Sequence, residues 1–255
     1  MIITSRSNNI FKSIKKLNSK SQREKNGQYI LEGLRIVKDA IENGGDIEYI
    51  VISSDYKGEY IDKVPVYEFD KKLFDEIKET QNSQGIIAVA KLKKNYFESS
   101  YLENKKTIVY LDGVSDPGNM GTIIRTCDAA GVDVIILSDN CTDIYNPKTI
   151  RSTMSSIFNI PICFDKNQDE TVRILKENGF NIICTDLKAT KYHYELDLTQ
   201  KSVIVIGNEA NGINDDLLNK ADINTKIPIV GKCESLNAAV ACSIMVYEAL
   251  RQKSI

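Results

Sequence analysis

The 255-residue sequence lacks several features that common classes of enzyme require. Its only histidine is His193, which argues against a Ser-His-Asp triad and against a zinc site built on two imidazoles. Its six cysteines form no C-x-x-C pair and most of them stand in apolar runs. We therefore expect reduced core thiols, with no disulfide framework and no metal.

Long hydrophobic runs are also absent. No apolar stretch approaches the roughly 20 residues of a membrane-spanning helix. The first residues carry charge without the apolar h-region of a secretory signal. These features predict a cytoplasmic protein with no membrane partner, and the chain is long enough for two modest domains or one large one.

Net charge gives no overall sign of a nucleic-acid partner, because it is only −2. The distribution of charge is less even. Residues 1–25 hold seven lysines and arginines against a single acid, Glu24. This segment is either a local phosphate-binding surface or a solvated terminus, and the sequence leaves both interpretations open.

Short apolar runs alternate with segments of helical periodicity, which predicts an α/β fold in two domains. Strands and helices alternate over residues 1–95, so we expect a small α/β domain there. Residues 91–106 hold five lysines among mostly polar residues with little apolar periodicity, which predicts a linker, and we place it at residues 96–106. A second domain is then expected over residues 107–255.

The second domain begins with a stretch that organises the rest of the chain, VYLDGVSDPGNMGTIIRTCDAAGVDVIIL over residues 109–137. Its two apolar runs and the helical spacing between them predict a βαβ unit. The first turn is unusually rich in glycine, aspartate and asparagine. In open α/β sheets the ligand site lies beyond the carboxyl ends of the strands, so this turn is the first place to look for chemistry.

The turn partly resembles two nucleotide-binding motifs, the P-loop and the dinucleotide fingerprint, but it matches neither. Gly113 and Gly118 have the spacing of a P-loop, but Asn119 and Met120 stand where lysine and serine or threonine are needed. The dinucleotide fingerprint G-x-G-x-x-G is absent. What remains is Asn119 and Arg125, which are either a helix cap and a surface charge or parts of a site.

Three polar turns follow three apolar strands, at residues 116–119, 207–212 and 231–237. If these strands are parallel neighbours, their turns converge on one edge of the sheet. The turns would then gather one guanidinium, one carboxylate, amides and a hydroxyl: Arg125, Glu209, Asn119, Asn237 and Ser235. Such a pocket suits a polar, nucleoside-like ligand.

The same three turns resemble the motifs of the SpoU (TrmH-like) family of RNA ribose 2′-O-methyltransferases, in the SPOUT superfamily. The matching stretches are LDGVSDPGNMGTIIRTCDAAG, VIVIGNEANGI and IPIVGKCESLNAAVA, in the family's order and spacing. More weakly, REKNGQYILEGLRIVKDAI is similar to the start of the family's substrate-binding domain. The chain departs from the pattern at Ala210, where a glycine is usual, and at Thr153 and Ser155, which occupy a serine and a glycine position.

The resemblance implies more about the fold than the strand pattern does. Pattern alone favours an ordinary doubly wound sheet, because knots are nearly absent from proteins. The family instead has a parallel-sheet domain with a deep trefoil knot. It binds S-adenosylmethionine in that knot, near positions that correspond here to Thr185, Gly207, Ile227 and Leu236, and it acts as a homodimer.

The resemblance also implies an S-adenosylmethionine-dependent RNA ribose 2′-O-methyltransferase whose catalytic residues are Arg125, Asn119, Glu209, Ser235 and Asn237. Arg125 would act as a base or, more easily for a guanidinium, through a charge-assisted hydrogen bond. Ribosomal RNA is the favoured substrate because of the separate N-terminal domain. Transfer RNA, or a non-catalytic RNA- or ribosome-binding role for the same fold, are the alternatives.

Overall fold

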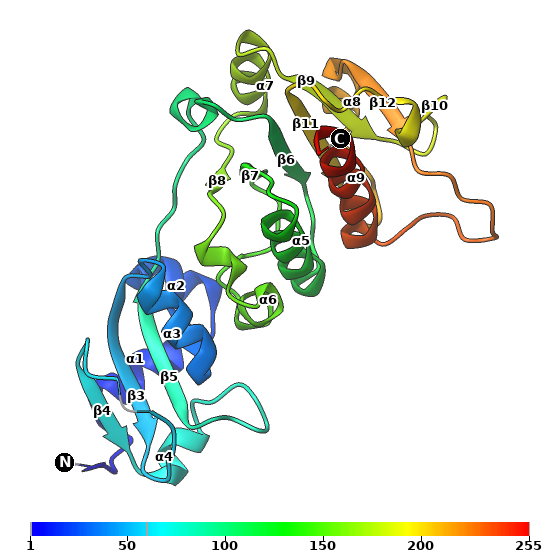
Figure 1. The fold of residues 1–255 in the computed structure, drawn as a ribbon. Coiled ribbons are helices and arrows are strands. Elements are labelled where there is room, and N and C mark those ends of the chain that lie inside the picture. Colours follow the sequence, from blue (N-terminus) through cyan, green and yellow to red (C-terminus); the bar gives the residue numbers. More distant parts are fainter. Residues whose placement is uncertain (1, 60, 255) are drawn as a thin grey trace. The chain divides into compact units, whose positions relative to one another are not determined.

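The computed structural model describes residues 2–59 and 61–254, which form two compact units (Figure 1). The first unit contains the chain up to Lys93 together with Asp143–Phe158. The second contains Lys94–Thr142 and the chain from Asn159 onward. In the described ranges no helix is both long enough and apolar enough to span a membrane.

The first unit is built on a five-stranded mixed sheet in the order β1-β4-β3-β5-β2. Strand β5 runs antiparallel to both of its neighbours, and the other pairs are parallel. The strands are β1 (Ile2–Ile3), β2 (Gln28–Glu32), β3 (Ile47–Ser53), β4 (Val66–Phe69) and β5 (Ile86–Lys91). The helices are α1 (Asn9–Lys16), α2 (Lys20–Asn26), α3 (Leu34–Glu42), α4 (Lys71–Asp75) and α6 (Pro147–Thr153), followed by the 3₁₀ turn η2 (Ser156–Phe158).

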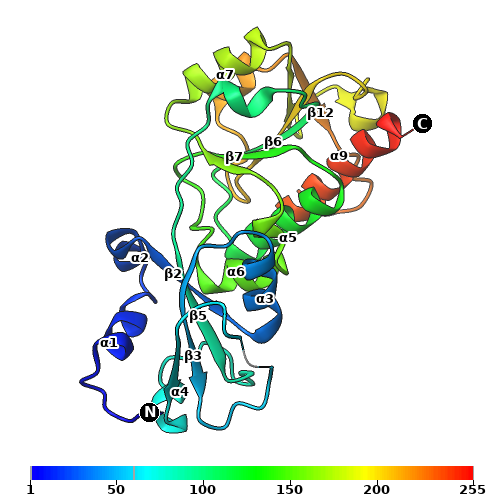
Figure 2. The same ribbon diagram turned by 60° about the vertical axis from the view of Figure 1, so that its left-hand side comes forward.

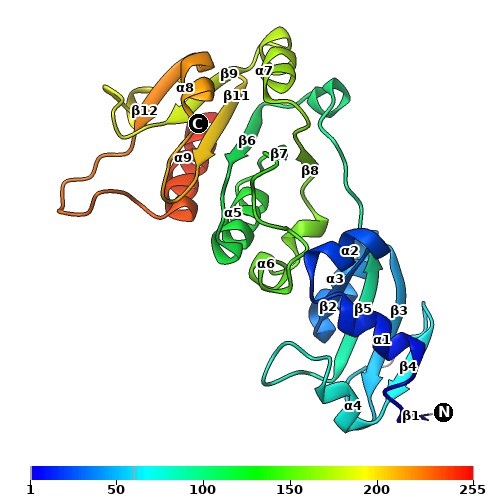
Figure 3. The same cartoon turned by 180° about the vertical axis from the view of Figure 1, so that it is seen from behind.

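The buried run of β5 serves two cores because successive side chains of a strand point to opposite faces. Ile87 and Val89 pack with the apolar side of α1. Ile86, Ala88 and Ala90 pack instead with α3. Figures 1 and 3 show α3 and α1 on opposite faces of this sheet. A continuous apolar run is therefore what this central strand requires.

Helix α6 and its flanks belong to this unit, although they lie inside the predicted 107–255 domain in chain order. Ile150 enters the core beside β2 and β5. The ring of Tyr145 lies 4.6 Å from that of Tyr29, between centroids. Asp143 accepts a 2.6 Å hydrogen bond from the guanidinium of Arg23, a buried side chain. Helical periodicity marks the apolar side of α6 but does not indicate which sheet that side covers.

The basic N-terminal segment is only partly available to a phosphate. Arg23 is buried against Asp143, while Arg6 and Lys15 both form ion pairs with Glu76. The remaining basic side chains of the segment are exposed lysines: Lys12, Lys16, Lys20 and Lys25.

The second unit is a seven-stranded parallel sheet in the order β10-β12-β9-β11-β6-β7-β8 (Figure 1). Its strands are β6 (Thr107–Asp112), β7 (Val134–Leu137), β8 (Ile162–Phe164), β9 (Asn181–Thr185), β10 (Lys191–Tyr192), β11 (Ser202–Gly207) and β12 (Ile223–Lys226). Its helices are α5 (Pro117–Ala129), α7 (Gln168–Glu177), α8 (Asp215–Lys220) and α9 (Ala238–Lys253), with 3₁₀ turns η1 (Ser99–Leu102) and η3 (His193–Glu195). The predicted α/β fold with a parallel C-terminal sheet is confirmed.

Successive side chains of the central strands again point to opposite faces of the sheet, and different helices cover the two faces. Tyr110 of β6 and Val205 of β11 pack with α7 and α8. Helices α5 and α9 pack against each other (Figure 2), and α9 also contacts β11. Part of the predicted linker 96–106 is packed as well, since Phe97 and Leu102 enter the core of this unit.

Candidate active site

The three polar turns of the sequence meet at one edge of the second sheet, as their positions predict. Strands β6 and β11 are parallel neighbours, with Asp112 opposite Gly207 in their last pair. Strands β9 and β12 are also parallel neighbours, with Thr185 opposite Thr225. All four strands therefore end at the same edge, and the segments that follow β6, β11 and β12 carry the three motifs.

Asn119 connects these motifs through its side-chain amide. Its Nδ2 donates a 2.8 Å hydrogen bond to Oε1 of Glu209. Its Oδ1 accepts a 2.8 Å hydrogen bond from Nδ2 of Asn237. The N-cap of α5 is Asp116, whose carboxylate accepts from the Asn119 N–H, so Asn119 lies in the first turn of the helix and does not cap it. Its side chain is therefore free to join the other two motifs.

Glu209 is held by the turn that begins α5. Its carboxylate accepts hydrogen bonds from the N–H and hydroxyl of Ser115, from the N–H of Asp116 and from Asn119. Partial burial raises the pKa of Glu209, but the hydrogen bonds from Asn119 and Ser115 outweigh it and lower the pKa to about 2. This carboxylate is therefore ionised at neutral pH.

Asn237 and Ser235 lie at the start of α9. The Asn237 side-chain oxygen caps the helix by accepting from the N–H groups of Ala239 and Val240. Its amide nitrogen is thereby turned toward Asn119. Ser235 is exposed and lines a cavity that is described below. The structure thus brings Asn119, Glu209 and Asn237 into one hydrogen-bonded chain, with Ser235 nearby.

Arg125 lies apart from this chain. It follows Asn119 by six positions, which places it about 240° further round the helix. It is exposed, and no hydrogen bond or ion pair of its side chain is seen among residues 2–59 and 61–254. Thr126, the next residue, faces α9 through a 3.5 Å contact with the hydroxyl of Ser243. Arg125 is thus directed away from the Asn119 network, and Glu209 is not its partner within this chain.

The four residues predicted to bind the cofactor line one cavity of about 280 Å³: Thr185, Gly207, Ile227 and Leu236. Its walls also include Ile206 and Ile229, with Ala238 and Ala241 of α9. The carboxylates of Asp186, Glu209 and Glu234 outnumber the single ammonium of Lys226. Apolar walls with an excess of negative charge suit a ligand with an apolar body and a positive centre, such as a sulfonium.

Gly207 allows the backbone to close tightly beside this cavity. A Cβ at this position would lie 2.3 Å from the carbonyl carbon of Gly212, which is closer than atoms can approach. The turn is closed by reciprocal 2.9 Å hydrogen bonds between the backbone groups of Asn208 and Gly212. The hydroxyl of Thr185 donates a hydrogen bond to the Val205 carbonyl, which fixes the position of β9 beside β11 at the cavity wall. These residues fit a cofactor that is held mainly by backbone groups.

Sequence reasoning overlooked Ser115 and Asp116, which hold Glu209. A signal was present, because an aspartate before proline is a common helix start and marks residues whose backbone donors need partners. In the described part of the chain, no group of three or more histidine, cysteine, aspartate or glutamate side chains is arranged to hold a metal.

Comparison with known proteins agrees with this geometry. The family model described as SpoU rRNA Methylase family matches residues 106–247, and the MRM3-like substrate binding domain matches residues 8–88. The chain is 33% identical over 247 residues to the 23S rRNA (guanosine(2553)-2′-O)-methyltransferase RlmP of Bacillus subtilis, covering 96% of this chain and 97% of that protein.

Solved structures extend the similarity to the whole fold. An AdoMet-bound rRNA methyltransferase from Sinorhizobium meliloti is 32% identical, with a TM-score of 0.89 over 98% of this chain and 97% of that one. The SpoU methyltransferase AviRb from Streptomyces viridochromogenes, in complex with AdoMet, is 25% identical, with a TM-score of 0.89 over 97% and 98% of the two chains. The chain therefore belongs to the SpoU family of S-adenosylmethionine-dependent RNA 2′-O-methyltransferases, and the knot of its second domain follows from that membership.

Proposed function

We propose that this protein methylates the ribose 2′-hydroxyl of a nucleotide in ribosomal RNA. The observation that carries the proposal is the bonding of Asn119 to both Glu209 and Asn237, which gathers the three motifs beside the cofactor cavity. Relatives that match along nearly the whole chain are named as rRNA methyltransferases. The 2′-hydroxyl is also the group that distinguishes RNA from DNA.

The cofactor cavity would hold S-adenosylmethionine between the turn at 207–212 and the start of α9. When bound, this cofactor supplies a methyl group on a positively charged sulfur, which is already activated for transfer. Ile227 and Leu236 provide apolar walls, and Thr185 and Gly207 fix the backbone around the ligand. The protein then has mainly to align the ribose oxygen with the methyl group.

The polar network would bind and orient the RNA. Asn119 and Asn237 are hydrogen-bonded to each other outside the cavity lining, while Ser235 adds a hydroxyl to the cavity wall itself. Glu209 keeps Asn119 in place through an ionised carboxylate. Arg125, which has no partner in the described chain, is available to an RNA phosphate or to the negative charge that develops on the ribose oxygen.

The active site is proposed to be completed by a second copy of the chain. Arg125 is directed away from the network of its own chain. Helix α9, which packs beside α5, exposes apolar side chains on its outer side, with Val240 47% and Tyr247 49% exposed. These two residues are separated by seven positions and so lie on one stripe of the helix. A dimer that covers this stripe would bring Arg125 close to the cavity of its partner.

The first unit is proposed to select the RNA. It corresponds to the MRM3-like substrate binding domain, and its exposed lysines at 12, 16, 20 and 25 provide a phosphate-binding surface. The six described cysteines are free thiols, which fits the cytoplasmic location predicted from the sequence.

The reaction can be tested with tritiated S-adenosylmethionine and total RNA from cells that lack the gene. Label in ribosomal RNA alone is the expected result. Label in transfer RNA would show that transfer RNA is the substrate. Cofactor binding without any label would favour an RNA-binding role without catalysis.

The role of Arg125 has its own test, in which Arg125→Ala is compared with Arg125→Lys. The alanine variant should lose methyl transfer while keeping its affinity for S-adenosylmethionine, since Arg125 does not line the cofactor cavity. The lysine variant should recover part of the rate through its charge. Loss of cofactor affinity in both variants would contradict this assignment.

A further inference from the structure

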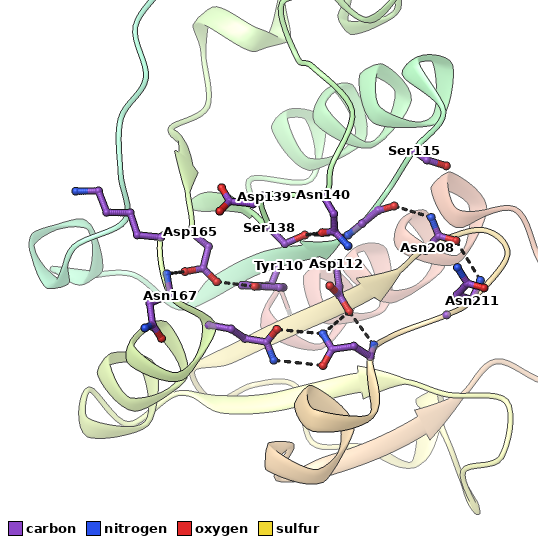
Figure 4. A pocket seen from close by; sticks show the side chains of 15 residues that line it. Tyr110, Asp112, Ser115, Ser138, Asp139, Asn140, Asp165, Asn167, Asn208 and Asn211 are labelled. Atoms are coloured by element: carbon purple, nitrogen blue, oxygen red, sulfur yellow. Dashed lines mark hydrogen bonds between the residues drawn. The ribbon is translucent and has the colours of Figure 1, made fainter.

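A second cavity, of about 620 Å³, lies at the same edge of the sheet in the second unit (Figure 4). Tyr110 and Asp112 line it, and Tyr110 points to the face that α7 and α8 cover. The cofactor cavity lies on the face that α9 covers. The turn at 207–212 is the wall between them, because Asn208 and Gly212 line both cavities. The methyl-transfer mechanism assigns no role to this second space.

Charge limits what the cavity can bind. Three carboxylates line it, from Asp112, Asp139 and Asp165, against one ammonium from Lys166. A phosphate or another anion is therefore disfavoured. A metal is disfavoured too, since the described residues contain no group of three or more suitable side chains arranged as ligands. The cavity size lies within the range of about 300–1,000 Å³ that is typical of small-molecule sites.

Asp112 supplies an acceptor at the floor of the cavity. Asp112 as a whole residue is 5% exposed. Its Oδ2 accepts two 2.8 Å hydrogen bonds from the backbone and side chain of Asn214. Its Oδ1 makes no hydrogen bond within the described residues. A carboxylate oxygen of a buried residue that lines a cavity takes its donor from a ligand or from water in that cavity.

Asn140 supplies a donor at the rim. Its Oδ1 accepts a hydrogen bond from the Ser138 hydroxyl, which orients the amide and leaves Nδ2 as the donor (Figure 4). Gly113 makes room for this group, because a Cβ there would lie 2.8 Å from Nδ2 of Asn140. Gly113 also has φ of +72°, a conformation that L-residues rarely adopt. The exposed carboxylate of Asp139 adds a second acceptor beside Asn140.

We propose that this cavity receives a nucleobase of the RNA substrate, with guanine preferred. A base is planar and neutral, and its edge offers donors next to acceptors. Ionised carboxylates only accept hydrogen bonds, so a base with several N–H groups is favoured. Guanine has the N1–H and N2–H₂ donors for Asp112 and Asp139, and its O6 can accept from Asn140. Uracil, with one N–H and two carbonyl groups, fits worst.

The position of the cavity relates this base to the reaction. Ser115 lines the cavity and also holds Glu209 of the cofactor site. A base bound here would therefore fix the register of an RNA strand that passes over the turn at 207–212. The inference rests on the proposed RNA substrate and adds a site that recognises one base of that RNA.

A binding experiment tests the cavity without methylation. Full-length protein saturated with S-adenosylhomocysteine is titrated with guanosine, adenosine, cytidine and uridine, and followed by NMR. Guanosine should bind most tightly and uridine most weakly. Asp139→Asn, which changes an exposed side chain, should weaken guanosine about 10-fold. Asp112→Asn should also weaken guanosine binding if the variant folds. Asp215→Asn removes an exposed carboxylate outside the cavity and should leave guanosine affinity unchanged.

A kinetic experiment links the cavity to the RNA. Asp139→Asn should raise KM for the RNA about 10-fold and leave kcat and the affinity for S-adenosylmethionine unchanged. Equal binding of the four nucleosides, or an unchanged guanosine affinity in Asp139→Asn, would overturn the proposal. Failure of the unaltered protein to methylate any RNA would instead refute the proposed function, and the nucleoside titration would still decide what the cavity binds.

Discussion

Replacing Asn119 by aspartate tests whether its amide joins the motifs as the structure shows. Asn119 Nδ2 lies 2.8 Å from a carboxylate oxygen of Glu209. Asn119→Asp removes this donor and places a second carboxylate against the first. At 2.8 Å two unit charges repel by about 1.5 kcal/mol at the dielectric constant of water, and by about 6 kcal/mol at an effective value of 20. Because the site is exposed, we expect a loss of stability near the lower figure at pH 7.

The pH dependence of this loss identifies its cause. In the unaltered protein the Glu209 pKa is about 2, so Glu209 contributes stability that is present above its ordinary pKa of 4.5 and is lost as the pH falls toward 2. In Asn119→Asp the two carboxylates compete, and one of them takes up a proton at a higher pH. The destabilisation should therefore shrink between pH 7 and pH 4.

The assay is urea unfolding of the two proteins at pH 7 and pH 4. Asn224→Asp is the matched control, because it makes the same chemical change at an exposed position of β12 where the amide donates to the carbonyl of Leu218 and to no carboxylate of the described residues. Adding Glu209→Gln to Asn119→Asp should restore most of the lost stability, since the new carboxylate then faces an amide. An equal loss at both pH values, with no recovery in the double variant, would refute the network.

Four further predictions follow from particular contacts. Ser155 has φ of +76°, a conformation that favours glycine, so Ser155→Gly should stabilise the protein by about 0.5–1 kcal/mol in urea unfolding; destabilisation would show that the conformation is not strained. Gly207→Ala should reduce S-adenosylmethionine affinity at least about 10-fold in calorimetry, because its Cβ meets Gly212. Gly179→Ala strains a turn with φ of +78° outside the cofactor cavity, so it should cost stability and leave the affinity unchanged. Val240→Asp with Tyr247→Asp should give a monomer in light scattering, whereas a retained dimer would place the interface elsewhere. The pKa of Glu209 should be about 2 by carboxyl ¹³C NMR, and Glu209→Ala should weaken cofactor binding.

Much of the fold could be predicted from the sequence because local patterns determine it. The strands β6 and β11 are buried on both faces, so their continuous apolar runs were enough to predict buried strands. Convergence of the turns at 116–119 and 207–212 was expected on the condition that these strands are parallel neighbours, and the structure meets that condition. The edge strands β1 and β10 have only two residues each, too few for any periodicity.

The unpredicted features depend on contacts between distant segments. The packing of α6 in the first unit rests on Ile150 and on the pairing of Arg23 with Asp143, which are 120 positions apart. The separation of Arg125 from Asn119 depends on which side of α5 meets α9. Spacing along a helix gives the angle between two side chains, but only the packed structure indicates which of them faces the network.

The most direct test of the central claim is the chemical position of the transferred methyl group. RNA labelled with tritiated S-adenosylmethionine is hydrolysed with alkali, which cleaves after every ribose that has a free 2′-hydroxyl. We expect the label to stay in an alkali-resistant dinucleotide, because the methylated oxygen cannot attack the neighbouring phosphate. Label released in mononucleotides would show methylation of a base and would contradict ribose methylation by this protein.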